Sequence, residues 1–377
     1  MLKLFNKISR VINKARIDKY AKSEQYRIIN EIDSKYNNSL LDRSKKQYLA
    51  HKFLNGRVHF FVLNFISFFS LPFLILVYLF LSVLNIFKKK ISVNKKLIVI
   101  YNNAPAIKSL ISNYNIIYKS GFFICFKDLT YIVKVILKFK LPPFFLIKFF
   151  IKITQYSYSF NKLGVCVVAT SSEYSFLSSA LTDYCHFYGR KHFNLMHGEK
   201  LFNIRDSFFE FDKAYIWDEY YINLYNSLKA KNGQFEIELP VIFEELIDKN
   251  SNQKKQTNLV KYYLNGSETK EQLEIINSII KNSKYKNIIF RPHPIYSDMK
   301  ELKKLGVTLE SSTMNIIDSI IEAKVVISKY STVLFQARYI NKSIVIDDVS
   351  NPSIYNMLVD TDYILLSKPH LKLSELC

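Results

Sequence analysis

The alternation of apolar and polar positions divides the chain into three parts. Residues 1–57 place apolar side chains among charged ones, which predicts a basic, amphipathic helical region. Residues 58–87 contain no Asp, Glu, Lys or Arg, and this run is longer than the about 20 residues that span a bilayer. From residue 97 onward, short apolar runs alternate with helical stretches, which is typical of β-α-β units. The pattern therefore predicts a helical region at 1–57, a membrane-inserting segment at 58–96 and an α/β remainder.

The α/β remainder divides at a polar stretch, Asp248–Thr257, which predicts a linker. Before it we expect a helix at Tyr174–Tyr188 and strands at Leu97–Tyr101, Phe122–Phe126, Val165–Ala169, Phe193–Met196 and Ala214–Trp217. After it we expect strands at Leu259–Leu264, Asn287–Phe290, Val307–Leu309, Lys324–Ser328 and Ser343–Ile346, with helices between them. We therefore predict two Rossmann-like domains, residues 97–247 and 258–377, that face a cleft and bind ligands beyond the carboxyl ends of their strands.

Three arrangements stay open for residues 58–87. Pro72 would break or kink a helix near its middle. The segment could be one kinked transmembrane helix, a re-entrant or in-plane hairpin bent near Ser70–Pro72, or a buried helix pair. Residues 130–160 interleave Lys with Phe and Ile, which predicts a segment on the membrane surface with lysines reaching anionic headgroups. An ordinary buried helix with a solvated lysine edge is the alternative for that second segment.

The charge sharpens this interpretation. The net charge is +21, from 53 basic and 32 acidic residues, and the excess lies within the first 162 residues. Basic residues concentrated in one part of the chain imply an anionic partner, and the neighbouring apolar run indicates that this partner is anionic membrane lipid. No nucleic-acid-binding motif accompanies the charge, so nucleic acid is not an expected partner. The scattered cysteines predict neither a disulfide framework nor a zinc site, and no metal site is expected.

Two motifs in the second α/β domain predict a phosphate site. Arg291 and His293 follow an apolar strand and are held by Pro292 and Pro294, so a guanidinium fork and an imidazole lie at a strand end. A second strand ends in Ser328, and Ser331 and Thr332 open the next helix, where hydroxyls and N–H groups bind anions. A solvated turn and plain N-capping are the structural alternatives.

These motifs resemble those of a group of bacterial surface-polymer transferases. The sequence Arg-Pro-His-Pro, followed by Ser-Lys-Tyr-Ser-Thr, is similar to the Arg-Pro-His-Pro and Ser-Asp-Tyr-Ser-Ser of CDP-glycerol glycerophosphotransferases. It also resembles the His-Pro and Ser-Ser/Thr motifs of bacterial sialyl- and polysialyltransferases. The resemblance covers about residues 285–348 and implies a GT-B fold, a cytidine-nucleotide donor and no essential metal. It further implies that His293, Ser331 and Thr332 contact donor phosphate. We add Arg291, Pro294 and Ser328 as candidate donor-binding residues from their places in the two motifs.

Candidate acceptor-side groups lie in the first α/β domain. His197 precedes Gly198 at a strand end, where the glycerophosphotransferases place a His-Gly whose histidine is thought to act on the acceptor hydroxyl. A histidine suits a base that works near neutral pH, and Glu173 and Glu199 are rival bases. The Asp/Glu-Asp/Glu-Gly motif of the sialyltransferases is missing from the sequence. Trp217 and Arg205 lie in an aromatic, charged stretch that is a candidate acceptor platform, with core packing as the alternative.

The sequence thus predicts a metal-independent glycosyltransferase on the cytoplasmic face of a bacterial inner membrane. Its donor would be a nucleotide-activated sugar, such as a CMP-sugar, used as co-substrate without a further cofactor. The acceptor would be a lipid-linked or growing capsular or lipopolysaccharide glycan. A CDP-glycerol-type polyol-phosphate transferase and a non-catalytic, membrane-bound glycan-binding protein are the alternatives.

Overall fold

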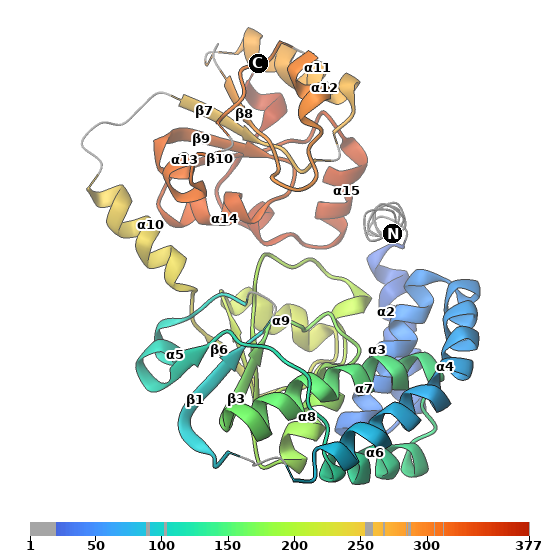
Figure 1. Ribbon diagram of the computed structural model, residues 1–377. Coiled ribbons are helices and arrows are strands. Elements are labelled where there is room, and N and C mark those ends of the chain that lie inside the picture. Colours follow the sequence, from blue (N-terminus) through green and yellow to red (C-terminus); the bar gives the residue numbers. More distant parts are fainter. Residues whose placement is uncertain are drawn as a thin grey trace. The chain divides into compact units, whose positions relative to one another are not determined.

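The computed structural model describes residues 20–87, 91–101, 104–252, 259–266, 268–283, 285, 288–304, 306–311 and 313–376. The chain forms two compact units. Unit 1 comprises Met1–His197 and Phe202–Leu239, and unit 2 comprises Gly198–Leu201 and Pro240–Cys377. Figure 1 shows that each unit contains a sheet covered by helices. The prediction of two α/β units is confirmed.

Unit 1 is built on a parallel sheet with strand order β2-β1-β3-β4-β5-β6. Its strands are β1 (Asn94–Ile100), β2 (Asn115–Ile117), β3 (Val165–Thr170), β4 (Lys191–Leu195), β5 (Lys213–Ile216) and β6 (Phe235–Ile237). Its helices are α2 (Lys22–Lys35), α3 (Leu40–Asn55), α4 (Arg57–Leu84), α5 (Lys108–Asn113), α6 (Phe126–Lys138), α7 (Pro143–Tyr158), α8 (Ser178–Phe187) and α9 (Glu219–Ser227).

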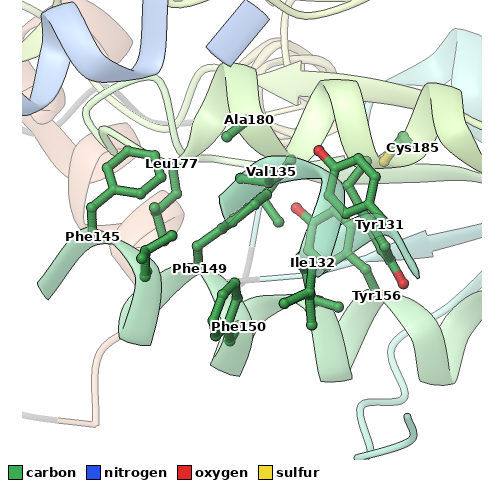
Figure 2. Packing of buried hydrophobic residues seen from close by; sticks show 14 of the residues in the cluster. Tyr131, Ile132, Val135, Phe145, Phe149, Phe150, Tyr156, Leu177, Ala180 and Cys185 are labelled. Atoms are coloured by element: carbon green, nitrogen blue, oxygen red, sulfur yellow. The ribbon is translucent and has the colours of Figure 1, made fainter. Parts of the chain in front are cut away.

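Both faces of this sheet are buried, which is why its central strands read as nearly continuous apolar runs. Side chains alternate along β1, so Val99 faces one core and Ile98 faces the other. The larger core joins the sheet to α6, α7 and α8, as Figure 2 shows for Tyr131 from α6, Phe149 from α7 and Cys185 from α8. Helices α3 and α4 pack onto this same helical layer. The N-terminal helical region is therefore part of unit 1 where the structure describes it.

Unit 2 contains a five-stranded parallel sheet of order β11-β10-β9-β7-β8. Its strands are β7 (Leu259–Tyr263), β8 (Ile288–Arg291), β9 (Ala323–Ser328), β10 (Ser343–Ile346) and β11 (Leu371–Lys372). Its helices are α10 (Val241–Ser251), α11 (Lys270–Asn282), α12 (Met299–Lys304), α13 (Ile316–Glu322), α14 (Thr332–Tyr339) and α15 (Pro352–Asp360). Strands β7, β8 and β9 are neighbours, so their carboxyl ends meet at one edge of the sheet.

Several predicted elements differ from the structure. Phe122–Phe126 is not a strand, because Phe126 opens α6 and the second strand of the chain is β2. The predicted linker Asp248–Thr257 is helical through Ser251 as the end of α10, and residues 253–258 lie outside the described residues. In Val307–Leu309, only an isolated bridge from Leu309 to Phe290 is formed.

The predicted membrane-surface segment 130–160 is mainly a core element. It forms the greater part of α6 and all of α7, and α7 buries Phe145, Phe149, Phe150 and Ile153 between α4 and α8. Burial also lowers the pKa of the amine of Lys148 on α7. The structure therefore supports the buried-helix alternative for α7, whereas the outer face of α6 keeps exposed apolar residues and lysines.

Candidate functional site

In unit 1, the candidate site lies at the carboxyl ends of two neighbouring strands. Ser171 follows β3 directly, and His197 follows β4 after one residue. Because β3 and β4 are parallel neighbours, both residues emerge at the same edge of the sheet. The Ser171 hydroxyl lies 2.7 Å from Nδ1 of His197 and 2.6 Å from the carbonyl oxygen of Leu195.

These two contacts determine which nitrogen of His197 carries the proton. The Ser171 hydroxyl has one proton and donates it to the Leu195 carbonyl, which can only accept. The hydroxyl oxygen must then accept a hydrogen bond from Nδ1–H of His197. In the neutral ring, the lone pair therefore lies on Nε2. With 45% of its side chain exposed, His197 has the form and the access that a general base requires.

Glu173 lies behind the imidazole ring of His197. Its side chain is fully buried, and Oε1 lies 3.8 Å from Nδ1 of His197. A group enclosed in this way cannot reach an acceptor hydroxyl, so the structure does not support Glu173 as the base. A negative charge at that distance would favour the imidazolium that forms when His197 accepts a proton. Gln47 of α3 fixes the Glu173 main chain by donating to its carbonyl oxygen over 2.8 Å.

Tyr174 connects His197 to two further side chains, Arg205 through its ring and His51 through its carbonyl oxygen. Its centroid lies 5.9 Å from that of His197, and the Arg205 guanidinium lies 5.3 Å from the Tyr174 ring. Nε2 of His51 is 3.0 Å from the Tyr174 carbonyl oxygen and donates to it. Burial, with Arg205 and Lys148 nearby, lowers the pKa of His51 to about 4, so its ring is neutral.

Of the two predicted acceptor residues, the structure places Arg205 on the ring of Tyr174, which His197 also contacts, and encloses Trp217. Arg205 is 40% exposed and forms an ion pair with Asp206 over 2.7 Å. Trp217 is only 7% exposed, and its indole N–H donates to the Met196 carbonyl over 3.1 Å. The indole thus holds the strand end that carries His197, and it does not form an open sugar platform.

Glu199, the third candidate base, belongs to unit 2. Its side chain is buried, and Oε2 accepts a hydrogen bond from the Tyr363 hydroxyl over 2.7 Å. Burial raises the pKa of Glu199 to about 8, so the carboxyl group is protonated at neutral pH. An enclosed acid that already holds its proton cannot serve as the acceptor base. Among the three candidates, His197 therefore combines partial exposure with an available lone pair.

In unit 2, the ends of β7, β8 and β9 bring the two predicted phosphate motifs to one edge of the sheet. The loop after β7 approaches the turn after β8 at Gly266, whose φ is +77°; a Cβ there would collide with Tyr296. Ser331 caps α14, since its hydroxyl accepts from the Val333 N–H over 3.3 Å, and Thr332 opens the helix. Ser328 is buried and donates to the Tyr263 carbonyl, so it supports the loop from beneath.

His293 has the opposite tautomer to His197. Its Nδ1 accepts hydrogen bonds from the backbone N–H groups of Ile295 and Tyr296, over 3.2 and 3.3 Å. The ring is half-buried on that of Tyr296, and desolvation lowers its pKa, which favours the neutral form. The proton then lies on Nε2, so His293 presents a hydrogen-bond donor. Pro294, the second proline of the motif, is exposed.

Arg291 has partners within unit 2. Its guanidinium pairs with the buried Glu310 and donates to the Met314 carbonyl over 3.0 Å. Glu310 also pairs with the buried Lys261 over 2.6 Å. Although the sequence predicts a phosphate ligand, the structure commits Arg291 to a buried ion network that fixes the end of β8.

Sequence reasoning missed Ser171, His51 and the loop after β7. The signal for Ser171 was available, because it follows the apolar run of β3 directly, as His197 follows β4. His51 gave no signal, since it lies on a helix far from the site in sequence. Among the residues that the structure describes, no group of three His, Cys, Asp or Glu side chains is arranged to hold a metal ion.

Comparisons with known proteins add structural likenesses at low identity. No family model and no curated protein matches the sequence. The chain is similar to the wall teichoic acid polymerase TagF, with 11% identity over 76% of this chain and 79% of that one, at a TM-score of 0.41. It is also similar to UDP-N-acetylglucosamine 2-epimerase from Rickettsia bellii, with 13% identity over 67% and 78% of the two chains and a TM-score of 0.45. The corresponding epimerase of Methanocaldococcus jannaschii gives 13% identity over 72% and 92%, with a TM-score of 0.43.

Proposed function

We propose that this protein is a glycosyltransferase that moves a sugar from a nucleotide-activated donor, such as a CMP-sugar, to a lipid-linked or growing surface glycan. The observation that carries the proposal is the state of His197, whose proton is held on Nδ1 by Ser171 while its lone pair lies on Nε2 of a half-exposed ring. This arrangement suits a base for an acceptor hydroxyl. The acceptor accordingly binds to unit 1.

In the proposed reaction, Nε2 of His197 takes the proton of the acceptor hydroxyl as its oxygen attacks the anomeric carbon of the donor sugar. The bond from that carbon to the donor phosphate breaks, and the nucleotide leaves with the bonding electrons. An ionised Glu173, at 3.8 Å, would favour the positive charge on the imidazolium. A base positioned in this way contributes about 10²–10⁴-fold to the rate.

The donor phosphate is assigned to unit 2. His293 offers an Nε2–H donor, and the first turn of α14 offers backbone N–H groups with the Ser331 and Thr332 hydroxyls beside them. These donors would stabilise the charge that develops on the leaving phosphate. The proposal therefore requires no metal ion, and the nucleotide-activated sugar is a co-substrate.

The exposed apolar surface of α4 and the basic N-terminal half lead us to place the protein on anionic lipid at the cytoplasmic face of a bacterial inner membrane. A lipid-linked acceptor, of capsular polysaccharide or lipopolysaccharide, in the same membrane would reach unit 1 without long-range diffusion.

The proposal is tested by a thermal-shift screen of CMP, CDP, UDP and GDP, followed by turnover of the matching nucleotide sugar. We expect one nucleotide to stabilise the protein. His293→Ala should abolish this stabilisation, whereas His197→Ala should keep it and lose turnover by at least about 10²-fold. Stabilisation by no nucleotide, or unchanged turnover in both variants, would contradict the proposal and favour a non-catalytic glycan-binding protein.

A polyol-phosphate transferase is the second candidate, favoured by the Arg-Pro-His-Pro sequence at Arg291–Pro294. The base and the phosphate donors would act as above, but the acceptor would attack phosphorus. Turnover of CDP-glycerol with no turnover of any nucleotide sugar would decide for this candidate.

A further inference from the structure

Helix α4 is bound to unit 1 along its whole length. Near its start, Asn64 donates to the Tyr48 hydroxyl over 2.7 Å and accepts from the Phe144 N–H over 3.2 Å. In the middle, Leu71 and Leu74 pack against the core cluster of α7 and α8. Just beyond its end, Asn85 donates to the Ile124 carbonyl over 2.8 Å. Figure 1 shows α4 beside α6 and α7.

The opposite face of α4 is apolar and exposed. Phe61 and Phe73 are each 71% exposed, and Phe69 is 66% exposed. The other exposed apolar residues on this helix and just after it are Val58, Val62, Phe65, Ile66, Phe68, Leu76, Leu79, Phe80, Leu81, Val83, Leu84, Ile86 and Phe87. Such a surface exceeds what single scattered apolar residues would explain and marks a contact with a partner.

The polar groups of α4 are arranged as a lipid environment requires. Ser67, Ser82 and Asn85 are buried on the side of unit 1, and Asn64 bonds to that side. Ser70 is exposed, but its hydroxyl donates to the Ile66 carbonyl over 2.9 Å. The outward face therefore brings no polar side chain into lipid without a hydrogen-bond partner.

A helix fixed in this way cannot cross a bilayer by itself. It is about 42 Å long, and the domain is attached at both ends and in the middle, so a spanning orientation would draw polar parts of unit 1 into the hydrocarbon. We propose that α4 lies parallel to the membrane, with its Phe-rich face in one leaflet and unit 1 on the cytoplasmic side. This inference stands whether or not the protein is a transferase.

Neighbouring charges identify the partner as anionic lipid. Arg57 is exposed at the start of α4. On α6, which packs beside α4, Lys127 and Lys134 are exposed together with Phe126, Val133 and Leu137. Apolar residues with lysines at their edge suit a headgroup boundary. A second copy of the chain is a poor partner for this face, because each copy would bring a strongly basic N-terminal half.

Fluorescence depth measurement tests the orientation. Phe61→Trp, Phe69→Trp and Phe80→Trp are made singly in the full chain, which is mixed with phosphatidylcholine vesicles containing 30% phosphatidylglycerol and lipids brominated at shallow or deep acyl positions. These positions lie about 29 Å apart from first to last along the helix axis. We expect equal, shallow quenching at all three. Native Trp217, buried in unit 1, should stay unquenched and serves as internal reference.

Vesicle sedimentation tests the contact itself. Phe65→Glu/Phe73→Glu should weaken binding at least about tenfold, whereas the matched control Ile275→Glu/Val359→Glu, on exposed residues of unit 2, should not. Omitting phosphatidylglycerol should also weaken binding at least about tenfold. Stronger quenching of Phe69→Trp by deep bromines than of the outer two would show a spanning helix and overturn the proposal. Absent quenching, with a dimer that Phe65→Glu/Phe73→Glu dissociates, would also overturn it.

Discussion

Replacing Glu173 by Gln should change how the reaction depends on pH. The substitution replaces the carboxyl group, whose Oε1 lies 3.8 Å from Nδ1 of His197, with an amide of the same size that cannot carry a negative charge. Two unit charges about 4 Å apart interact by about 1 kcal/mol in water and about 4 kcal/mol near a protein surface. Because the His197 ring is 45% exposed, we take the lower part of this range, which corresponds to about 1–2 pH units.

The direction of the shift in the pH profile follows from the role of His197 as the base. Without the carboxylate, the imidazolium form of His197 is less favourable, so the ring stays unprotonated at lower pH. The acid limb of kcat/KM should therefore move down by about 1–2 pH units in Glu173→Gln. At the plateau, the rate should fall a few-fold, because a weaker base accepts the acceptor proton less readily.

The assay is initial-rate kinetics between pH 4 and 9 with the donor that the nucleotide screen identifies. Glu199→Gln is the matched control, because Glu199 is already neutral at pH 7 and an amide oxygen can still accept from Tyr363. Its acid limb should coincide with that of the unmodified protein. An acid limb that stays in place in Glu173→Gln, or moves upward, would refute the assignment of His197 as a base supported by Glu173.

Three further predictions concern the same groups and the fold. Ser171→Ala removes the acceptor of the His197 Nδ1 proton and should lower kcat about 5–10-fold with little change in KM, while Ser171→Thr should retain most of the rate. Glu199→Gln should raise the Tm at pH 8 and above, because a buried carboxyl group with a raised pKa makes the folded protein less stable as the pH rises from about 4.5 to about 8. Near pH 4 the variant and the unmodified protein should have the same Tm. Equal Tm values at every pH would contradict this prediction. Lys261→Met leaves the buried Glu310 with fewer partners and should cost about 3–5 kcal/mol in urea unfolding, against less than about 0.5 kcal/mol for the exposed Lys270→Met.

The sequence was sufficient to predict the two parallel sheets, because β-branched runs such as Val165–Thr170 and Ala323–Ser328 alternate with helical stretches, as in β-α-β units. The prediction of strands from the sequence was wrong where aromatic residues dominate. Phe122–Phe126 has the composition of a strand, but Asp128 caps the helix that begins at Phe126 by accepting from the Cys125 N–H over 2.7 Å. The three-residue strands Asn115–Ile117 and Phe235–Ile237 were too short to give a periodic signal.

Residues of the candidate site could be predicted from the sequence only where they follow an apolar run that forms a strand. His197 and His293 were found because each follows an apolar run. The commitment of Arg291 to Glu310 was not visible, since the pair is separated by 19 positions in the chain. Likewise, the enclosure of Glu173 and Trp217 depends on packing by α3 and by the strand ends, which no local pattern encodes.

The opposite tautomers of the two histidines have a consequence for how such proteins diverge. At position 293 the ring is required only to offer an N–H, and its own acceptor is satisfied by the backbone of Ile295 and Tyr296. An amide side chain of Asn or Gln also offers an N–H and an acceptor oxygen, so another donor residue can replace His293. In the proposed reaction, the ring at position 197 must accept a proton on its lone pair and release it again near neutral pH, which an amide cannot do. Under that proposal, descendants of this chain could exchange His293 and stay active, whereas loss of His197 would leave a protein that holds its donor but does not use it.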